Sequence, residues 1–296
     1  MLSDMPDVAA AASRIAPYAR RTPTLRAEVD GRPVVLKLEH LQRTGSFKVR
    51  GALNALLGAP ARPERVVTAS GGNHGLAVAT AAALLDLPAT VYTPASVPTA
   101  KARRIEATGA KLIRHGATYA EAADAAMAVP DALYVPAYDH PLVIAGQGTC
   151  AAEAVADAPD VDAIVVAVGG GGLAAGTVLG SGGRHVMAVE PHGCQALHDA
   201  LAAGRPVDSP VGGVARSALG ATRVGAVPFA ILRSVTSALV SDEEILAARD
   251  RLWEEFRLAV EPAGAVPFAA WLAGAVPGEL SCLILCGANT DWTPAD

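Results

Sequence analysis

The stretch AIVVAVGGGGLAAGTVLGSGG, residues 163 to 183, decides the fold. It carries no charge and is long enough to span a membrane as a single helix. Its four consecutive glycines, Gly169 to Gly172, argue against that interpretation, because each glycine inside a helix costs about 1 kcal/mol relative to alanine. A buried strand over 163–168, a glycine loop and the start of a helix explain the same residues without that cost. The stretch therefore predicts one strand–loop–helix unit of an α/β fold.

The rest of the chain repeats this alternation of short β-branched runs and alanine-rich helical segments. Parallel strands need a helical connection between them, so the order predicts an α/β fold of open, twisted, mainly parallel sheets with helices on both faces. Strands are expected at 34–38, 65–69, 89–93, 111–115, 133–137, 163–168, 185–190 and 280–286. Helices are expected at 74–85, 98–108, 119–128, 145–157, 194–203 and 242–256.

The strand–helix units between about 65 and 143 form a compact block that can make a small sheet of its own. One sheet of eight or more strands is the alternative. With two sheets, residues 61–145 form a small domain, and residues 1–60 and 146–296 form a larger one. Ligands of such folds bind where the carboxyl ends of strands meet helix N-termini, which predicts a site in the cleft between the domains.

Composition excludes several classes of function. The 296-residue chain has a net charge of -5 and no basic cluster, so nothing in it indicates a nucleic-acid partner. The N-terminal segment has no positively charged start of a secretory signal, and no membrane span is expected. The cysteines form no CxxC pair and have no histidine partners at ligand spacing, which argues against disulfides and zinc and indicates the reducing cytoplasm; they are Cys150, Cys194, Cys282 and Cys286.

The first chemical motif is TGSFKVRGA, residues 44–52, in a chain with only four lysines. Lys48 stands between Phe47 and a run of small and apolar residues. Taken alone, it is most simply a solvated residue at a helix start. An apolar setting would instead lower the pKa of its amine and make it a nucleophile or a base, and such lysines form Schiff bases.

Two glycine-containing turns follow predicted strands. TASGGNHGLAVA, residues 68–79, places Ser70, Asn73 and His74 in one tight turn before a helix, where backbone N–H groups bind anions. An ordinary capped turn is the alternative. VGGGGL, residues 168–173, suits a phosphate monoester, although Glu190 lies near the distance at which a dinucleotide-binding fold has an acidic residue. A nicotinamide enzyme therefore stays possible at this point.

A fourth motif, LILCGANTD at 283–291, ends an apolar strand at Cys286. A buried cysteine is usually a small core residue, but at a strand end before a glycine it can face a ligand. Together, these motifs resemble the fold-type II pyridoxal-phosphate enzymes of the serine/threonine dehydratase and serine racemase family. The segments HLQRTGSFKVRGA, ASGGNHG, VIAGQGT, VGGGGL, VEP, EPAGA and CGANTD all occur in the family's order along nearly the whole chain.

The resemblance implies a pyridoxal 5'-phosphate cofactor and a role for each matching residue. Lys48 corresponds to the Schiff-base lysine, Phe47 to the ring beside the cofactor, and Asn73 to the partner of its 3-hydroxyl. Cys286 corresponds to the neutral group beside the pyridine nitrogen, and Glu261 to an acid behind the cofactor. The phosphate is expected on the amides of Gly169, Gly170, Gly171 and Gly172.

The resemblance also implies the reaction, a β-elimination that converts L-threonine or L-serine to a 2-oxo acid and ammonia. The substrate carboxylate is expected at Ser70, Gly71, Asn73 and His74. A neutral thiol at Cys286 cannot hold the ring nitrogen protonated as a carboxylate would, which favours elimination over transamination.

Racemases of this family carry a serine at the position of Gly71, and glycine has no side chain to deliver a proton. Dehydratase is therefore favoured over the alternatives, which are a racemase and a lyase for another β-hydroxy amino acid such as 3-hydroxyaspartate. Arg216 and Ser217 stand where family members often have an acidic residue, which indicates a changed substrate preference. Glu190 matches one ligand of a family cation site, for a divalent or monovalent ion. A homodimer is expected from the same likeness.

Overall fold

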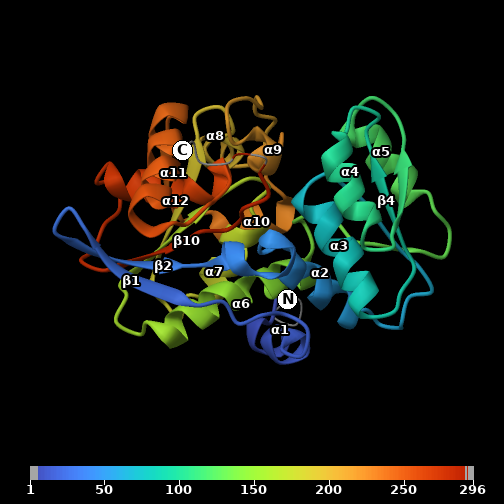
Figure 1. The fold of residues 1–296 in the computed structure, drawn as a ribbon, viewed down its shortest axis with the longest axis horizontal. Coiled ribbons are helices and arrows are strands. Elements are labelled where there is room, and N and C mark those ends of the chain that lie inside the picture. Colours follow the sequence, from blue (N-terminus) through green and yellow to red (C-terminus); the bar gives the residue numbers. More distant parts are fainter. Residues whose placement is uncertain (1–5, 291, 293–296) are drawn as a thin grey trace.

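The computed structural model describes residues 6–290 and 292, and its strands form two separate sheets (Figure 1). Neighbouring strands pair in parallel, except for the antiparallel hairpin of β1 and β2. In sheet order, the larger sheet contains β1 (Thr24–Val29), β2 (Arg32–Lys37), β10 (Ser281–Ile284), β7 (Ala163–Ala167), β8 (His185–Pro191) and β9 (Thr236–Val240). The smaller sheet contains β5 (Lys111–Arg114), β4 (Ala89–Thr93), β3 (Val66–Ala69) and β6 (Leu133–Tyr134).

Helices cover both faces of the larger sheet, so the predicted fold class is confirmed. In Figure 1, α11 and α12 lie on one side of β2 and β10, and α6 and α7 lie on the other. Around the larger sheet are α1 (Val8–Ile15), α6 (Pro141–Asp157), α7 (Gly172–Gly180), α8 (Ala196–Ala203), α9 (Arg216–Leu219), α10 (Ala226–Leu232), α11 (Asp242–Phe256) and α12 (Pro262–Leu272). Beside the smaller sheet are α2 (Lys48–Leu57), α3 (Asn73–Leu84), α4 (Thr99–Glu106) and α5 (Tyr119–Met127).

The uncharged stretch at 163–183 forms the expected strand, glycine loop and helix. Every residue of β7 is buried, as a strand covered on both faces should be. Small residues let α7 approach α6 closely: a Cβ on Gly176 would lie 2.5 Å from the backbone nitrogen of Gly148. Within 6–290 and 292, no helix has both the length and the apolar character that crossing a membrane requires.

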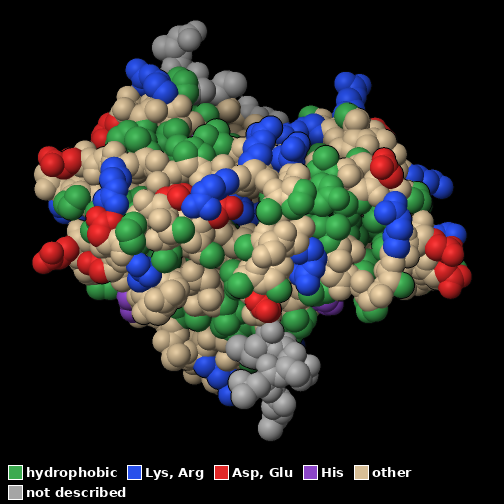
Figure 2. All heavy atoms as spheres, turned by 90° about the horizontal axis from the view of Figure 1, so that it is seen from below, with side chains coloured by type: hydrophobic (Ala, Val, Ile, Leu, Met, Phe, Trp, Pro, Cys, Tyr) green, Lys and Arg blue, Asp and Glu red, His purple; other side chains and the backbone are tan. Residues whose placement is uncertain are grey.

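Charged side chains of both signs are interspersed on the face shown in Figure 2, where lysines and arginines alternate with aspartates and glutamates. Apolar side chains lie between them. Neither sign of charge forms one continuous patch over this face.

Two strands were not predicted, and two predicted strands, those at 133–137 and 280–286, are each three residues shorter than expected. The hairpin turn of β1 and β2 is Asp30–Gly31, with φ of +52° and +72°, and such Asp-Gly pairs are a known hairpin signal. In the edge strand β9, Thr236 is exposed and the next three residues are only partly buried, so its pattern is weak. The strand expected at 133–137 ends at Tyr134, and Ala137 lies in the wall of a cavity described below.

A buried ion network fixes the start of α2 and was not anticipated from the sequence. Arg50 is fully buried and donates to Glu39 at 2.6 Å and to Glu153 at 2.7 Å. Lys37 is buried as well and donates to Glu153 at 2.8 Å and to the carbonyl of Thr22 at 2.6 Å. The two cations and two carboxylates balance, so no charge is left uncompensated inside the protein.

Candidate active site

The segment before α2 is held against the end of β10, which is how two distant motifs meet. Ser46 and Gly287 form an isolated antiparallel bridge. The Phe47 amide donates to the carbonyl of Cys286 at 3.1 Å. Lys48, the first residue of α2, therefore lies beside the carboxyl end of the central strand of the larger sheet.

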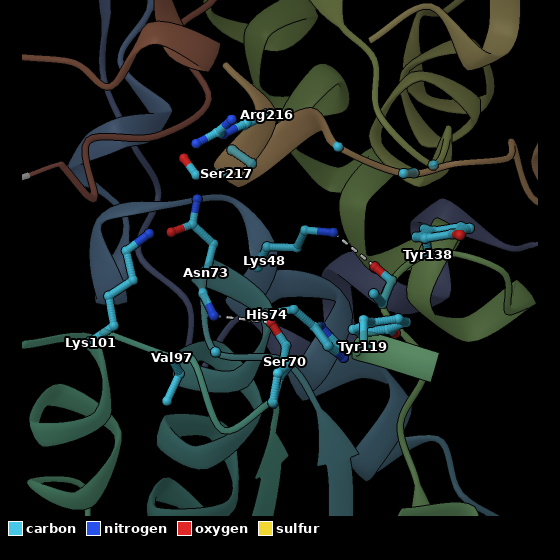
Figure 3. A pocket seen from close by; sticks show the side chains of 18 of the residues that line it. Lys48, Ser70, Asn73, His74, Val97, Lys101, Tyr119, Tyr138, Arg216 and Ser217 are labelled. Atoms are coloured by element: carbon cyan, nitrogen blue, oxygen red, sulfur yellow. Dashed lines mark hydrogen bonds between the residues drawn. The ribbon is translucent and has the colours of Figure 1, made fainter. Parts of the chain in front are cut away.

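The Lys48 amine lies at the floor of a cavity between the two sheets (Figure 3). Its Nζ donates to the carbonyl oxygen of Ala137 at 2.8 Å and lies 5.1 Å from the centre of the Phe47 ring. Burial lowers the pKa of this amine to about 8, against the opposing effects of Cys286 and Glu261. Near neutral pH, far more of this amine is therefore neutral than of an ordinary lysine, and the neutral form is the one that acts as a nucleophile or base.

A narrow cavity beside Lys48 brings together all the residues predicted to hold the cofactor. Its walls come from the start of α2, the start of α3, the glycine loop after β7, the start of α12 and the end of β10. The predicted residues that line it are Phe47, Lys48, Asn73, Gly169, Gly170, Gly171, Gly172, Glu261 and Cys286. The structure thus supports their grouping, and their individual roles remain predictions.

The glycine loop has the shape of an anion site. Gly171 has a φ of +92°, which side chains rarely adopt, and it caps the N-terminus of α7. A Cβ on Gly170 would lie 2.3 Å from a ring carbon of Tyr138, so only glycine fits under that ring. Consecutive backbone amides before a helix N-terminus are suited to a phosphate group.

Buried polar groups face the same cavity from the other side. The side-chain amide of Asn73 donates to Glu261 Oε1 at 2.7 Å, and burial raises the pKa of Glu261 to about 7. Burial also raises the pKa of the Cys286 thiol above its ordinary range, so the thiol stays neutral. The chemistry of this wall fits the pyridine end of pyridoxal phosphate, with a neutral thiol for the ring nitrogen.

A larger cavity of about 450 Å³ opens next to the narrow one, and both include Lys48 and Asn73 in their walls. Ser70, Gly71 and His74 also line it, so the structure brings the predicted substrate residues together. The amides that begin α3 have no partner within the helix and can bind a carboxylate.

His74 takes part in this cavity through its backbone more than through its ring. Its Nε2 lies 3.0 Å from the carbonyl oxygen of Val135, within the buried core. Burial and the nearby Lys48 ammonium lower the pKa of His74 to about 3, so the imidazole carries no charge. The amide of His74, rather than a charged ring, is therefore available to a carboxylate.

Glu190 is the one predicted site residue that the structure places elsewhere. It is buried at the end of β8, where its oxygens accept from the amides of Leu197 and His198, each at 2.8 Å. Burial raises its pKa to about 8. The described part of the chain contains no group of three or more histidine, cysteine or acidic side chains that could hold a metal ion.

Several lining residues carried no signal in the sequence. Tyr138 follows the strand end of β6 and borders both cavities, and Ala137 contributes only a carbonyl oxygen. Val97 and Lys101 come from the loop after β4 and from α4. A strand-end position could have drawn attention to Tyr138, whereas the orientation of the others depends on packing between distant segments.

Comparison with known proteins agrees with this geometry. Residues 15–287 match the family described as pyridoxal-phosphate dependent enzyme. The chain is 38% identical to an L-threonine ammonia-lyase of Geobacter sulfurreducens, covering 94% of this chain and 73% of that protein. It is 32% identical to a serine racemase of Arabidopsis thaliana, covering 98% and 94%. The crystal structure of a T.th. threonine deaminase is 37% identical and superposes with a TM-score of 0.90 over 99% of both chains.

These similarities extend over nearly the whole chain and include both sheets and both cavities. They confirm the resemblance of the sequence motifs, and they confirm that the chain is an enzyme that uses pyridoxal phosphate. They leave the role of each residue to experiment. The chain belongs to the pyridoxal-phosphate dependent enzyme family, with the fold-type II architecture.

Proposed function

We propose that this enzyme catalyses the β-elimination of L-threonine, L-serine or both, with release of a 2-oxo acid and ammonia. The proposal rests on one observation above all: the Lys48 amine lies where the narrow cavity and the larger cavity meet. An amine in that place can bond the cofactor aldehyde and later reach the Cα of a substrate. When bound, the cofactor supplies the electron sink for the developing carbanion.

The narrow cavity would hold the cofactor with groups that are already in place. The amides of Gly169–Gly172 would bind its phosphate, and the Phe47 ring would pack beside the pyridine ring. Asn73 would turn its amide to the 3-hydroxyl, and Cys286 would face the ring nitrogen as a neutral thiol. Glu261 would hold Asn73 in position through the 2.7 Å hydrogen bond.

The larger cavity would orient the amino acid. The amides at the start of α3 and the hydroxyl of Ser70 would bind its carboxylate, which fixes Cα near Lys48. The neutral form of Lys48 would then take the Cα proton, because a general base works best when its pKa lies near the operating pH. The β-hydroxyl then departs as water with the proton taken from Cα, and the released enamine reacts with water to give the 2-oxo acid and ammonia.

Gly71 supports elimination over racemisation. Racemisation needs a proton donor on the second face of the substrate, and Gly71 has no side chain to provide one. Val97 strengthens this preference, since its Cγ2 lies only 2.4 Å from where a Cβ on Gly71 would be. The space for a donor at this position is already filled.

The remaining features of the proposal concern organisation. We propose that residues 61–145 form the small domain and residues 1–60 and 146–296 the large one, that the enzyme is a cytoplasmic homodimer, and that any cation effect acts through Glu190. Sizing chromatography tests the dimer. Activity measured with and without a chelator tests the cation.

The decisive assay measures ammonia and 2-oxo acid from a panel of hydroxy amino acids. We expect a yellow protein that releases both products from L-threonine or L-serine and loses nearly all activity as Lys48→Ala. Borohydride should bleach the wild-type protein and leave the reduced cofactor covalently attached to Lys48. The proposal would be refuted if the assay showed the opposite enantiomer of the substrate and no ammonia. A colourless protein that binds NAD would refute it as well.

A further inference from the structure

The larger cavity is basic, although the protein as a whole carries a net charge of -5. Its lining includes Lys48, Lys101 and Arg216, and among the described residues it includes no aspartate or glutamate. Threonine and serine each bring one carboxylate to this cavity. The amides of α3 and the hydroxyl of Ser70 are placed to bind that group, so two of the cations have no evident task.

Lys101 and Arg216 converge on one end of the cavity from different parts of the chain. Lys101 extends from α4, beside the smaller sheet, and Arg216 extends from α9, beside the larger one. Figure 3 shows both charged ends on the side where Asn73 and Ser217 lie. The Lys48 amine points the other way, toward Ala137.

Neither charge is neutralised by a neighbour within 6–290 and 292. No hydrogen bond or ion pair is formed there by the side chain of Lys101 or Arg216, whereas Arg104 donates to Asn289 and Arg223 pairs with Asp208. Lys101 is half-buried and Arg216 is exposed, and cationic side chains that line a cavity without a carboxylate partner can bind an anion there.

The nearest buried acid does not remove the excess charge. Glu261 lines the narrow cavity rather than the larger one, and its Oε1 already accepts the hydrogen bond from Asn73. Lys101 and Arg104 lower the pKa of Glu261, but burial outweighs them and keeps it at about 7. Near neutral pH, this carboxyl is therefore partly uncharged and cannot balance two cations.

We propose that Lys101 and Arg216 form a second anion subsite, which selects β-hydroxy amino acids that carry a second carboxylate on Cβ. This inference rests on the proposed function and names the substrate class that the same site prefers. One carboxylate binds at the start of α3, and the other binds between the two cations. A planar guanidinium suits the second group because it can pair with both carboxylate oxygens. The preferred substrate is thus a hydroxylated amino dicarboxylate, such as L-threo-3-hydroxyaspartate.

Binding to the holoenzyme tests the subsite without turnover. Succinate and butyrate have the same chain length and differ by one carboxylate. We expect calorimetry to show that succinate binds wild-type enzyme roughly tenfold or more tightly than butyrate, and that this advantage is lost in Lys101→Met and Arg216→Met. Arg103→Met is the matched control, because Arg103 is an exposed residue of α4 outside the cavity lining, and it should keep the advantage.

Turnover supplies the second readout. The ratio of kcat/KM for L-threo-3-hydroxyaspartate to kcat/KM for L-threonine should favour the dicarboxylate and fall roughly tenfold in Lys101→Met and in Arg216→Met. Equal binding of succinate and butyrate, or an unchanged advantage in both variants, would overturn the subsite. If the enzyme releases ammonia from L-threonine but shows no preference for the dicarboxylate, the subsite is overturned and the proposed function stands. Failure to release ammonia from any hydroxy amino acid would instead overturn the proposed function, while the succinate comparison would still decide the subsite.

Discussion

The pair of Gly71 and Val97 should control whether this enzyme can invert a substrate as well as eliminate from it. Gly71→Ser places a hydroxyl on the face of the substrate opposite a base, where a second proton donor is needed. The same change drives a Cβ to 2.4 Å from Val97 Cγ2, far closer than two carbons can approach. We therefore expect Gly71→Ser to gain some racemisation at the expense of elimination, and Gly71→Ser with Val97→Ala to gain more.

The energetic cost follows from the surroundings of Val97. Overpacking of this kind costs typically about 1–3 kcal/mol in the free energy of unfolding. Val97 is only half-buried, in a loop whose neighbours Ser96 and Pro98 are exposed, so the loop can shift and the cost should be at the lower end, about 1 kcal/mol. Val97→Ala removes the methyl groups that cause the clash. The free energy of unfolding of the double variant should therefore be about 1 kcal/mol higher than the sum of the effects of Gly71→Ser and Val97→Ala predicts.

Two measurements on wild type, Gly71→Ser, Val97→Ala and the double variant test these expectations. Urea unfolding gives the coupling free energy, and chiral chromatography after incubation with L-serine gives the ratio of D-serine to 2-oxo acid. If the changes in the free energy of unfolding add up, Val97 does not clash with a side chain at position 71. A well-folded double variant that still releases ammonia but forms no D-serine would refute the argument that the missing donor decides the reaction.

Three further perturbations are expected to have distinct outcomes. Burial lowers the pKa of Lys48 from 10.5 to about 8, so in the cofactor-free enzyme Lys48 binds more protons in the unfolded state than in the folded state between these values. The contribution of Lys48 to stability should therefore rise with pH across that window, and urea titrations should show wild type gaining stability relative to Lys48→Met. Arg50→Met leaves the buried Glu39 carboxylate without its cation and should lower the free energy of unfolding by about 3–5 kcal/mol. Gly170→Ala drives a Cβ into the Tyr138 ring at the phosphate site and should weaken cofactor uptake, measured by visible absorbance, at least tenfold.

Matched controls separate these effects from general damage. Arg103→Met, at an exposed position of α4, should change the free energy of unfolding by less than about 0.5 kcal/mol. Gly212→Ala has room for its methyl group, with the nearest atom at 4.0 Å, and should leave cofactor absorbance unchanged. A stability curve of Lys48→Met parallel to that of wild type, or an Arg50→Met protein as stable as the Arg103→Met control, would contradict the buried electrostatics described here.

The sequence revealed the parts of the site that depend on local rules. The glycine loop at 169–172 follows a run of buried β-branched residues, and the turn at 70–74 follows another, so strand, loop and helix could be placed from the letters alone. Lys48 stood out because lysine is rare in this chain and this one is surrounded by apolar residues. Parallel sheets bring such strand ends to one edge, which is why the motifs meet.

What could not be predicted depends on contacts between distant segments. Arg50 looks like a solvated helix residue until Glu39 and Glu153 are brought around it. The Ala137 carbonyl that holds the Lys48 amine has no side-chain signature at all. Similarly, nothing in the pattern of α4 shows that Lys101 lines a cavity, because the sequence does not distinguish a lysine that faces solvent from one that faces a ligand.

The position of β10 also sets the order in which the protein can be completed on the ribosome. This strand lies between β2 and β7 in the larger sheet, although almost the whole length of the chain separates it from β2. The newly made β1–β2 hairpin must therefore wait with an unpaired edge until the last strand emerges, and such edges attract chaperones and other nascent chains. Because the Ser46–Gly287 bridge can form only after residue 287 has been synthesised, the reactive amine takes up its place late in folding.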